Sequence, residues 1–210
     1  KTLTKVKNIS GLEKSNGWWN KVVRTDIDHD GDADFVLGNL GLNSKFRATR
    51  VSPISLYVND FDDNGSIEPI FAFHREGKQY PMALRQDIIK QMSSLKKKFV
   101  YYKDYAGKSL TEIFEPRLLE KATVLQSYET RSSVVINNGD GSFVINPLPI
   151  EAQVSPVFAI EPADLNNDGH EDLILGGNLF SVKPEVGRYD ALHGLIVLGN
   201  GKGGFTSLPS

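Results

Sequence analysis

Three short acidic loops combine the residue types and the spacing that a hard metal ion requires. Each loop has oxygen-bearing side chains at its first, third, fifth and ninth positions and Gly at its sixth. Ca²⁺ prefers about six to eight oxygen ligands, and a sharp turn at Gly lets one short loop surround the ion. The loops therefore predict two to three Ca²⁺ ions. The expected ligands, including a backbone carbonyl at the seventh position, are Asp26, Asp28, Asp30, Asp32, Asp34, Asp60, Asp62, Asn64, Ser66, Glu68, Asp164, Asn166, Asp168, His170 and Asp172.

The flanking residues separate these loops from EF-hands. An EF-hand needs a bidentate Glu at the twelfth position and a helix on each side of the loop. The twelfth residues here are Leu37, Phe71 and Leu175, which cannot bind a cation. The segments 34–38 and 172–176 are short apolar runs that end in Gly, a pattern typical of buried strands. We therefore expect the loops to join strand to strand.

A second interpretation needs no metal, because Asp, Asn and Gly also favour ordinary turns. The loop at 26–34 argues against it most strongly, since its five Asp side chains repel one another and a bound cation relieves that repulsion. The loop at 60–68 is the weakest of the three, with Asn64 and Glu68 at its fifth and ninth positions.

Composition limits the class of protein. The chain has 210 residues, 40% hydrophobic and 24% charged, with a net charge of −2 and no cysteine. These values are ordinary for a globular protein and give no sign of nucleic acid as a partner. No apolar run reaches the length of a membrane span. Because weak calcium loops suit about millimolar Ca²⁺, we expect an extracytoplasmic location, either secreted, on the cell surface or in the periplasm.

Internal repeats predict the fold. The segments 134–143 and 196–205 each read as a strand, a Gly-rich turn and a second strand. Together with the acidic loops they give a repeat of roughly sixty residues with four short strands, which points to propeller blades. We expect an all-β chain that forms a partial β-propeller of about three four-stranded blades. A closed propeller has about four blades or more, so with Lys1 in place of Met we expect a piece of a longer propeller chain.

One stretch departs from the strand pattern. Residues 82–92 have apolar positions at helical spacing, Ser109 and Glu112 form a capping-box pattern, and Pro116 suits the first turn of a helix. The expected organisation is therefore blade residues 1–77 with two calcium loops, a helical insertion at 78–125, and blade residues 126–210 with the third loop.

These motifs resemble the FG-GAP/VCBS repeat family. The resemblance is carried by the Asp-rich loops at 26–34 and 164–172 and by the Gly-rich turns at 137–143 and 199–205. The segments 17–20, 38–43, 147–153 and 187–191 are also similar to the bacterial group of that family related to cartilage acidic protein and ASPIC/UnbV proteins. The likeness covers nearly the whole chain, although only the loops and turns are specific.

The resemblance implies an integrin-like β-propeller that binds ligands or partners outside the cytoplasm and does not catalyse a reaction. The integrin-type Phe-Gly and Gly-Ala-Pro signatures are replaced by Leu-Gly-Asn and Leu-Gly-Gly-Asn, at 37–39 and 175–178. Integrin-like ligand recognition therefore does not carry over to this chain, and a protein or glycan ligand stays open.

Catalytic motifs are absent from the sequence, which has no Gly-x-Ser-x-Gly, His-Glu-x-x-His or phosphate-binding loop. We therefore expect no enzyme and no catalytic residue. The alternative function is an accessory glycan-binding part of a carbohydrate-active enzyme or polysaccharide-uptake system. It is suggested by the aromatic cluster at 99–105 and by the polar loop from Arg188 to His193, although a loop that only orders itself also explains the latter.

Overall fold

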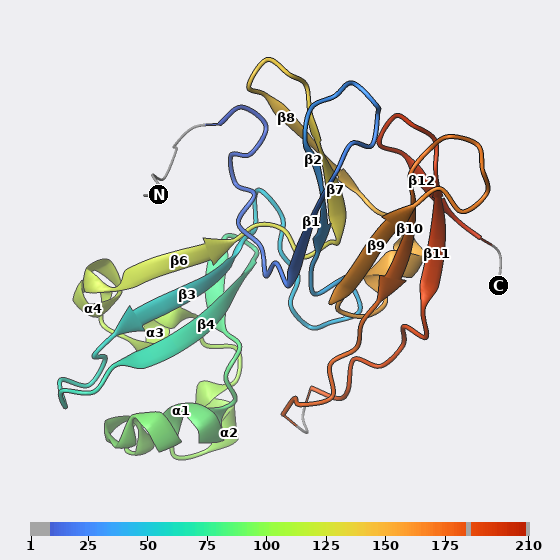
Figure 1. The fold of residues 1–210 in the computed structure, drawn as a ribbon. Helices are drawn as coiled ribbons and strands as arrows, with labels where there is room; N and C mark the ends of the chain where they lie inside the picture. Colours follow the sequence, from blue (N-terminus) through green and yellow to red (C-terminus); the bar gives the residue numbers. More distant parts are fainter. Residues whose placement is uncertain (1–8, 184–185, 209–210) are drawn as a thin grey trace. The chain divides into compact units, whose positions relative to one another are not determined.

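The computed structural model describes residues 9–183 and 186–208 (Figure 1). The described chain is mostly β, with three four-stranded antiparallel sheets and a few short helices. It divides into two compact units. The first unit contains residues 1–46 and 129–210, and the second contains residues 47–128. The all-β prediction is confirmed at this level, and the described sheets do not show a closed propeller.

The first unit holds two sheets of the same design, each a meander of four neighbouring strands. One sheet has the order β1-β2-β7-β8 and the other the order β9-β10-β11-β12. Their bounds are β1 Lys21–Thr25, β2 Asp34–Gly38, β7 Ser133–Asn137, β8 Phe143–Pro147, β9 Ala159–Ala163, β10 Asp172–Gly176, β11 Leu195–Gly199 and β12 Phe205–Ser207. The two acidic loops of this unit join β1 to β2 and β9 to β10, as the repeat predicts.

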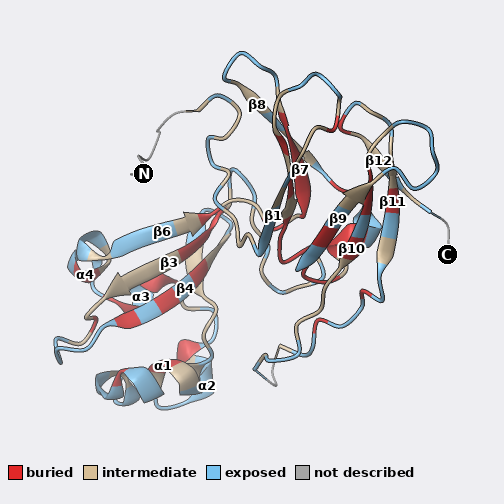
Figure 2. Cartoon of the chain, in the orientation of Figure 1, coloured by how far each residue is buried: buried red, intermediate tan, exposed pale blue. Residues whose placement is uncertain are grey.

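Apolar side chains from the central strands form the core of the first unit. Val36 and Val134 from one sheet and Leu173 and Val197 from the other have no exposed surface. Figure 2 shows this burial as red segments on β7 and β10. Burial of whole Val and Leu side chains contributes about 1.5–3 kcal/mol each, so these strands stabilise the frame that carries both loops.

Two asparagines, the buried Asn39 and the half-buried Asn178, close the long connections that follow β2 and β10. The Asn39 side-chain amide donates to the Glu129 carbonyl at 3.1 Å, and its oxygen accepts from the Leu40 N–H. The Asn178 amide donates to the Leu192 carbonyl at 2.9 Å, and its oxygen accepts from the Leu192 N–H. Each Asn therefore joins the start of a long excursion to its end, which explains the repeated Leu-Gly-Asn and Leu-Gly-Gly-Asn motifs.

The second unit contains one sheet of a different design. Its order is β5-β4-β3-β6, so the fourth strand returns to lie beside the first, as in a Greek key. Its strands are β3 Ile54–Asn59, β4 Glu68–Arg75, β5 Lys78–Pro81 and β6 Thr123–Ser127. Only two of the three sheets thus have the meander order expected of blades, because β6 reaches β3 after the helical segment.

Short helices cover one face of this sheet. They are α1 Arg85–Gln91, η1 Ser93–Lys96, α2 Tyr102–Tyr105, α3 Leu110–Ile113 and α4 Pro116–Lys121; a further turn, η2 Ile150–Gln153, belongs to the first unit. The capping box between Ser109 and Glu112 and the helix start at Pro116 are present as predicted. Ile70 and Ala72 of β4 pack with Ile88 and Met92 in the core of this unit.

The helical segment shares its compact unit with a sheet. The expected insertion runs over residues 78–125 and leaves the loop at 60–68 in a blade. The compact second unit spans residues 47–128, so it also includes β3, β4 and their acidic loop. The helices need the sheet as a surface to cover, so strands and helices form one unit.

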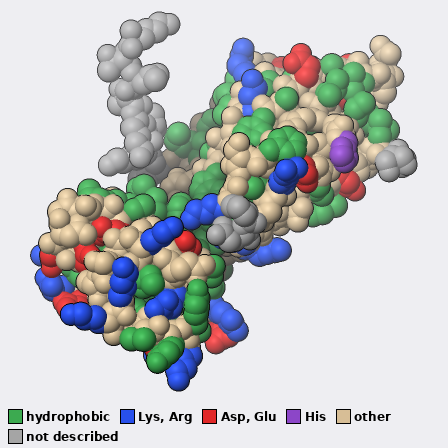
Figure 3. Space-filling model, turned by 90° about the horizontal axis from the view of Figure 1, so that it is seen from below, with side chains coloured by type: hydrophobic (Ala, Val, Ile, Leu, Met, Phe, Trp, Pro, Cys, Tyr) green, Lys and Arg blue, Asp and Glu red, His purple; other side chains and the backbone are tan. Residues whose placement is uncertain are grey.

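On the face in Figure 3, Lys and Arg side chains lie scattered among hydrophobic and polar ones.

In the described part of the chain, no helix is long and apolar enough to cross a membrane.

Candidate metal sites

The three acidic loops share one backbone conformation. The fourth residue of each has a positive φ, at 58° for His29, 54° for Asp63 and 61° for Asn167. The sixth residue is Gly with a φ of 84–92° in every loop. Two left-handed residues separated by one position turn the chain sharply, and Gly accepts this conformation without strain. The same short sequence pattern therefore folds in the same way at all three places.

The ninth residue of each loop is a buried carboxylate that accepts the N–H of the second residue. Asp34 accepts from Ile27 at 2.8 Å, Glu68 from Phe61 at 2.9 Å, and the carboxylate of Asp172 from Leu165 at 3.0 Å. The exposed fractions of the three acidic residues are 0%, 3% and 0%. These bonds close each loop across its base.

In the first unit the ninth residue also joins the loop to the third strand of its sheet. The second oxygen of Asp34 accepts the N–H of Asn137, at the end of β7, at 2.8 Å. The second oxygen of Asp172 accepts the N–H of Gly199, at the end of β11, at 2.9 Å. The sequence pattern gives no sign of Asn137 and Gly199, because their contribution is a backbone N–H that any residue except Pro supplies.

The first and fifth positions of each loop hold its backbone. The first carboxylate accepts the N–H of the sixth-position Gly, for example Gly65 to Asp60 at 2.8 Å. The fifth side chain accepts the N–H two residues later, as Asp30 accepts from Asp32 at 2.8 Å. The corresponding bonds occur in the other two loops. Asp30 and Asn64 thus have an oxygen occupied by their own loop.

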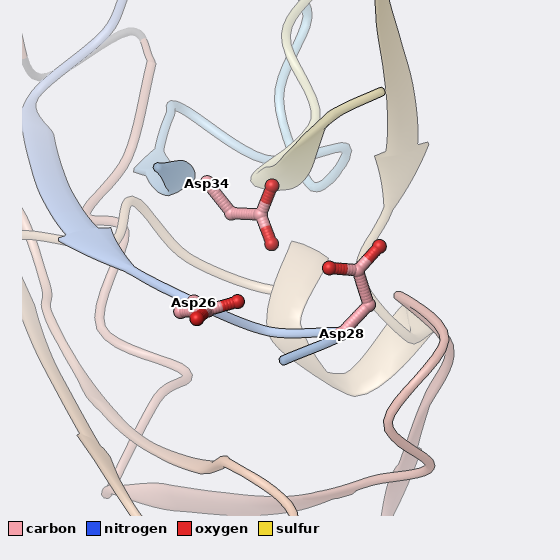
Figure 4. A group of neighbouring side chains, drawn as sticks. All are labelled: Asp26, Asp28 and Asp34. Atoms are coloured by element: carbon pink, nitrogen blue, oxygen red, sulfur yellow. The ribbon is translucent and has the colours of Figure 1, made fainter. Parts of the chain in front are cut away.

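Two carboxylate clusters form where the sequence predicts metal ligands. Asp26, Asp28 and Asp34 offer oxygens that all lie within 4.8 Å of one another, and Figure 4 shows these side chains converging. Asp60, Asp62 and Glu68 form the equivalent cluster in the second unit. Positions one, three and nine are therefore brought together in both loops. These two clusters could hold a metal ion.

Oxygen atoms in both clusters are buried without a hydrogen-bond partner in the part of the chain that the structure describes. They are Oδ1 of Asp26, Oδ1 of Asp28 and Oδ1 of Asp62. A buried carboxylate oxygen without a partner is costly, whereas a bound cation satisfies it directly. The residues present thus fit a hard cation, for which carboxylate oxygens are suitable ligands.

Burial and like charge raise the pKa of a carboxyl group in each cluster. Burial is the largest cause for Asp28, followed by the charges of Asp34 and Asp30. Burial is also the largest cause for Glu68, with smaller contributions from Asp62 and Asp60. Without a cation, each cluster therefore resists full ionisation.

The third loop balances its charge differently. It has Asn166 at the third position, where the other loops have a carboxylate. The Asn166 side-chain amide donates to Oδ2 of Asp168 at 2.9 Å. This bond, followed by the N–H of His170, lowers the pKa of Asp168. The predicted ligands of the third loop thus have an internal hydrogen bond where the other two loops have converging carboxylates.

The seventh position has a structural role that sequence reasoning missed. A Cβ on Gly139 would lie 2.6 Å from Oδ2 of Asp32, and one on Gly201 would lie 2.4 Å from Nδ1 of His170. Each Gly-rich turn therefore packs against the seventh residue of the neighbouring acidic loop. The repeated Asn-Gly pair in the sequence was the signal that could have indicated this packing.

The rings of His29 and His170 also stack, with centroids 6.3 Å apart.

The polar loop from Arg188 to His193 separates into residues with different environments. Tyr189 is 6% exposed, and its backbone pairs with Leu179. Arg188, Asp190 and His193 are exposed. The pairing of Tyr189 supports the interpretation that this loop orders itself.

Comparisons with protein-family models, with curated proteins and with solved structures found no significant match to this chain.

Proposed function

We propose that this chain is a non-enzymatic, calcium-stabilised repeat segment of an extracytoplasmic protein, in which the two meander sheets are blades of a β-propeller of the FG-GAP/VCBS kind. In this proposal it serves adhesion, scaffolding or ligand binding. Calcium has a structural role: it neutralises clustered carboxylates and fixes the strand-to-strand loops. Binding to the native state alone stabilises that state by linkage.

One observation carries the proposal: both clusters contain buried carboxylate oxygens without a hydrogen-bond partner among the described residues. Oδ1 of Asp26 and Oδ1 of Asp28 in one loop, and Oδ1 of Asp62 in the other, are such atoms. Turns that needed no metal would satisfy these oxygens with N–H or hydroxyl donors, as the ninth position does. A set of carboxylate oxygens from one short loop suits Ca²⁺, which accepts varied geometries, better than Mg²⁺, which demands a near-ideal octahedron.

The proposed location follows from the same ligands. Loops with few ligands bind calcium weakly, with dissociation constants of about 10⁻⁴–10⁻³ M in extracellular modules. Such sites fill where calcium is about millimolar, outside the cytoplasm. Two ions are proposed for the clusters of the first two loops, and a third ion for Asp164, Asn166, Asp168 and Asp172.

Calcium titration calorimetry, paired with thermal melts in calcium and in chelator, tests the proposal. The wild-type chain should bind two to three ions, and chelator should lower its melting temperature. The double variant Asp28→Ala/Asp62→Ala should lose the binding at both clusters, whereas Asp190→Ala, an exposed Asp outside them, should match the wild type. Unchanged binding in the double variant, or no binding by the wild type at millimolar calcium, would overturn the proposal.

A further inference from the structure

A hollow in the second unit lies between the β4–β5 hairpin and the segment that joins α2 to α3. Its volume is about 430 Å³. This falls in the range of roughly 300–1,000 Å³ that is typical of small-molecule sites. The hollow lies within one compact unit, and none of its lining residues belongs to the acidic loop of that unit.

Aromatic rings give the hollow a firm apolar wall. Phe73 and Tyr80 face each other across β4 and β5, and their rings stack with centroids 5.9 Å apart and an interplanar angle of 29°. Tyr105 is 9% exposed, and its hydroxyl donates to the Ala83 carbonyl at 2.8 Å. Burial raises the pKa of Tyr105, so the phenol stays protonated and keeps this bond. Such rings offer flat surfaces to a ring-shaped ligand.

The charged side chains that line the hollow favour an anion. Arg75 and Lys108 contribute two positive charges, against one negative charge from Glu76. Arg75 pairs with Glu76 at 3.4 Å, and Lys108 pairs with Glu112 at 3.1 Å. Both pairs are solvent-exposed, and exposed pairs contribute little to stability. Each cation can therefore turn toward a ligand carboxylate at small cost.

Gly107 leaves one side of the hollow open. It has a φ of 73°, and a Cβ built on it would meet no atom within 4 Å. The neighbouring Lys108 is placed by the start of α3, where the Glu112 carboxylate accepts the N–H of Ser109 at 2.9 Å. The segment thus leaves one side of the hollow open and places the Lys108 backbone next to the start of α3.

We propose that this hollow binds a small ring-shaped carboxylate, with the ring against Phe73 and Tyr80 and the carboxylate between Arg75 and Lys108. Sugar acids and aromatic acids share this chemistry. The inference is independent of the calcium sites, and it gives the glycan-binding alternative a specific location in the chain.

Titration of the whole ¹⁵N-labelled chain, in saturating calcium and followed by amide chemical shifts, tests this inference. The probes are digalacturonate as a sugar acid, benzoate as an aromatic acid and galactobiose as a neutral disaccharide. We expect saturable shifts at Tyr80, Tyr105 and Gly107 with at least one of the two acids, and much weaker ones with galactobiose. The acid that binds more tightly identifies the source of the ligand.

Variants separate a built site from unspecific attraction. Arg75→Gln/Lys108→Gln should weaken binding at least tenfold, and Gly107→Asn, which tolerates a positive φ, should weaken it by adding a side chain to the hollow. Lys90→Gln, an exposed cation on α1, is the matched control and should bind as the wild type does. Melting temperatures confirm that each variant is folded. No saturable binding of either acid, equal binding of galactobiose, or unchanged affinity in the double variant would overturn the inference.

Discussion

The loops at 26–34 and 164–172 occupy the same place in the two meander sheets of the first unit, yet they balance their charges in different ways. In both loops the fourth and sixth residues have a positive φ. In both, a buried ninth carboxylate closes the loop across its base. The difference lies at the third position. Asp28 adds a carboxylate to a cluster, whereas Asn166 donates a hydrogen bond to Asp168.

The comparison separates two roles that the shared motif combines. The backbone conformation and the ninth-position anchor are common to both loops, so they belong to the fold. Among the described residues, the converging carboxylates belong to the loop at 26–34 and to its counterpart in the second unit. We therefore expect the choice of carboxylate or amide at the third position to set how strongly each loop binds a cation.

The largest expected effect concerns the anchor that both loops share. Asp34→Ala and Asp172→Ala each leave two backbone N–H groups without their acceptor, so each should destabilise the chain by about 3 kcal/mol or more. Urea denaturation in chelator measures this loss. The exposed Asp30→Ala serves as the control and should cost about 1 kcal/mol or less. If Asp34→Ala costs no more stability than Asp30→Ala, the ninth carboxylate is not the anchor that the two loops share.

The second prediction concerns the dependence on calcium. Calcium at about 100 times the dissociation constant of a site stabilises the native state by about 2.7 kcal/mol. Asp28→Ala should remove most of that stabilisation for its loop, and Asn166→Ala should remove less, because an amide is a weaker cation ligand than a carboxylate. The measurement is the melting temperature in calcium minus that in chelator. A larger loss for Asn166→Ala would reverse the proposed ranking of the loops.

The third prediction converts one loop into the other. Asn166→Asp removes the amide donor and adds a like charge, so it should destabilise the chain in chelator by about 1 kcal/mol. In calcium the same variant should recover stability and bind the ion more tightly. The reverse change, Asp28→Asn, should raise the melting temperature in chelator. Equal melting temperatures for Asn166→Asp and wild type in chelator would show that the amide bond does not set the balance.

The smallest expected effect is a difference in pH dependence in chelator. The native pKa of Asp28 is raised above its ordinary value of 3.8. The unfolded state therefore loses this proton at a lower pH than the native state does. As a result, the free energy of unfolding falls as pH rises from the ordinary pKa through the native one. The native pKa of Asp168 is lowered, so this residue stabilises the native state above its ordinary pKa. That stabilisation is lost as pH falls through the lowered native pKa.

Melting temperatures between about pH 3 and pH 7 check these opposite signs. Asp28→Asn should reduce the loss of stability on the alkaline side, and Asp168→Asn should reduce the loss on the acid side. Slopes of the same sign for the two residues would contradict the assigned environments.

The sequence by itself determined the features that depend on a few neighbouring residues. Nine residues with Asp at fixed positions and Gly at the sixth specify the loop, because its hydrogen bonds run between residues two to seven positions apart. The Gly-rich hairpins, the capping box at Ser109 and the helix start at Pro116 were predicted for the same reason. The propeller, the calcium ions and the extracytoplasmic location stay predictions.

Only the tertiary structure decided where the chain departs from its repeat and returns to it. The bond from the Asn39 N–H to Ser132 joins residues 93 positions apart. The strands β2 and β7 that it follows are also far apart in sequence, and no local pattern specifies their pairing. The return of β6 to β3 likewise depends on how the helices cover the sheet. Burial of the oxygens at Asp26, Asp28 and Asp62 follows from this packing, because solvent access to a side chain is set by everything around it and not by its own loop alone.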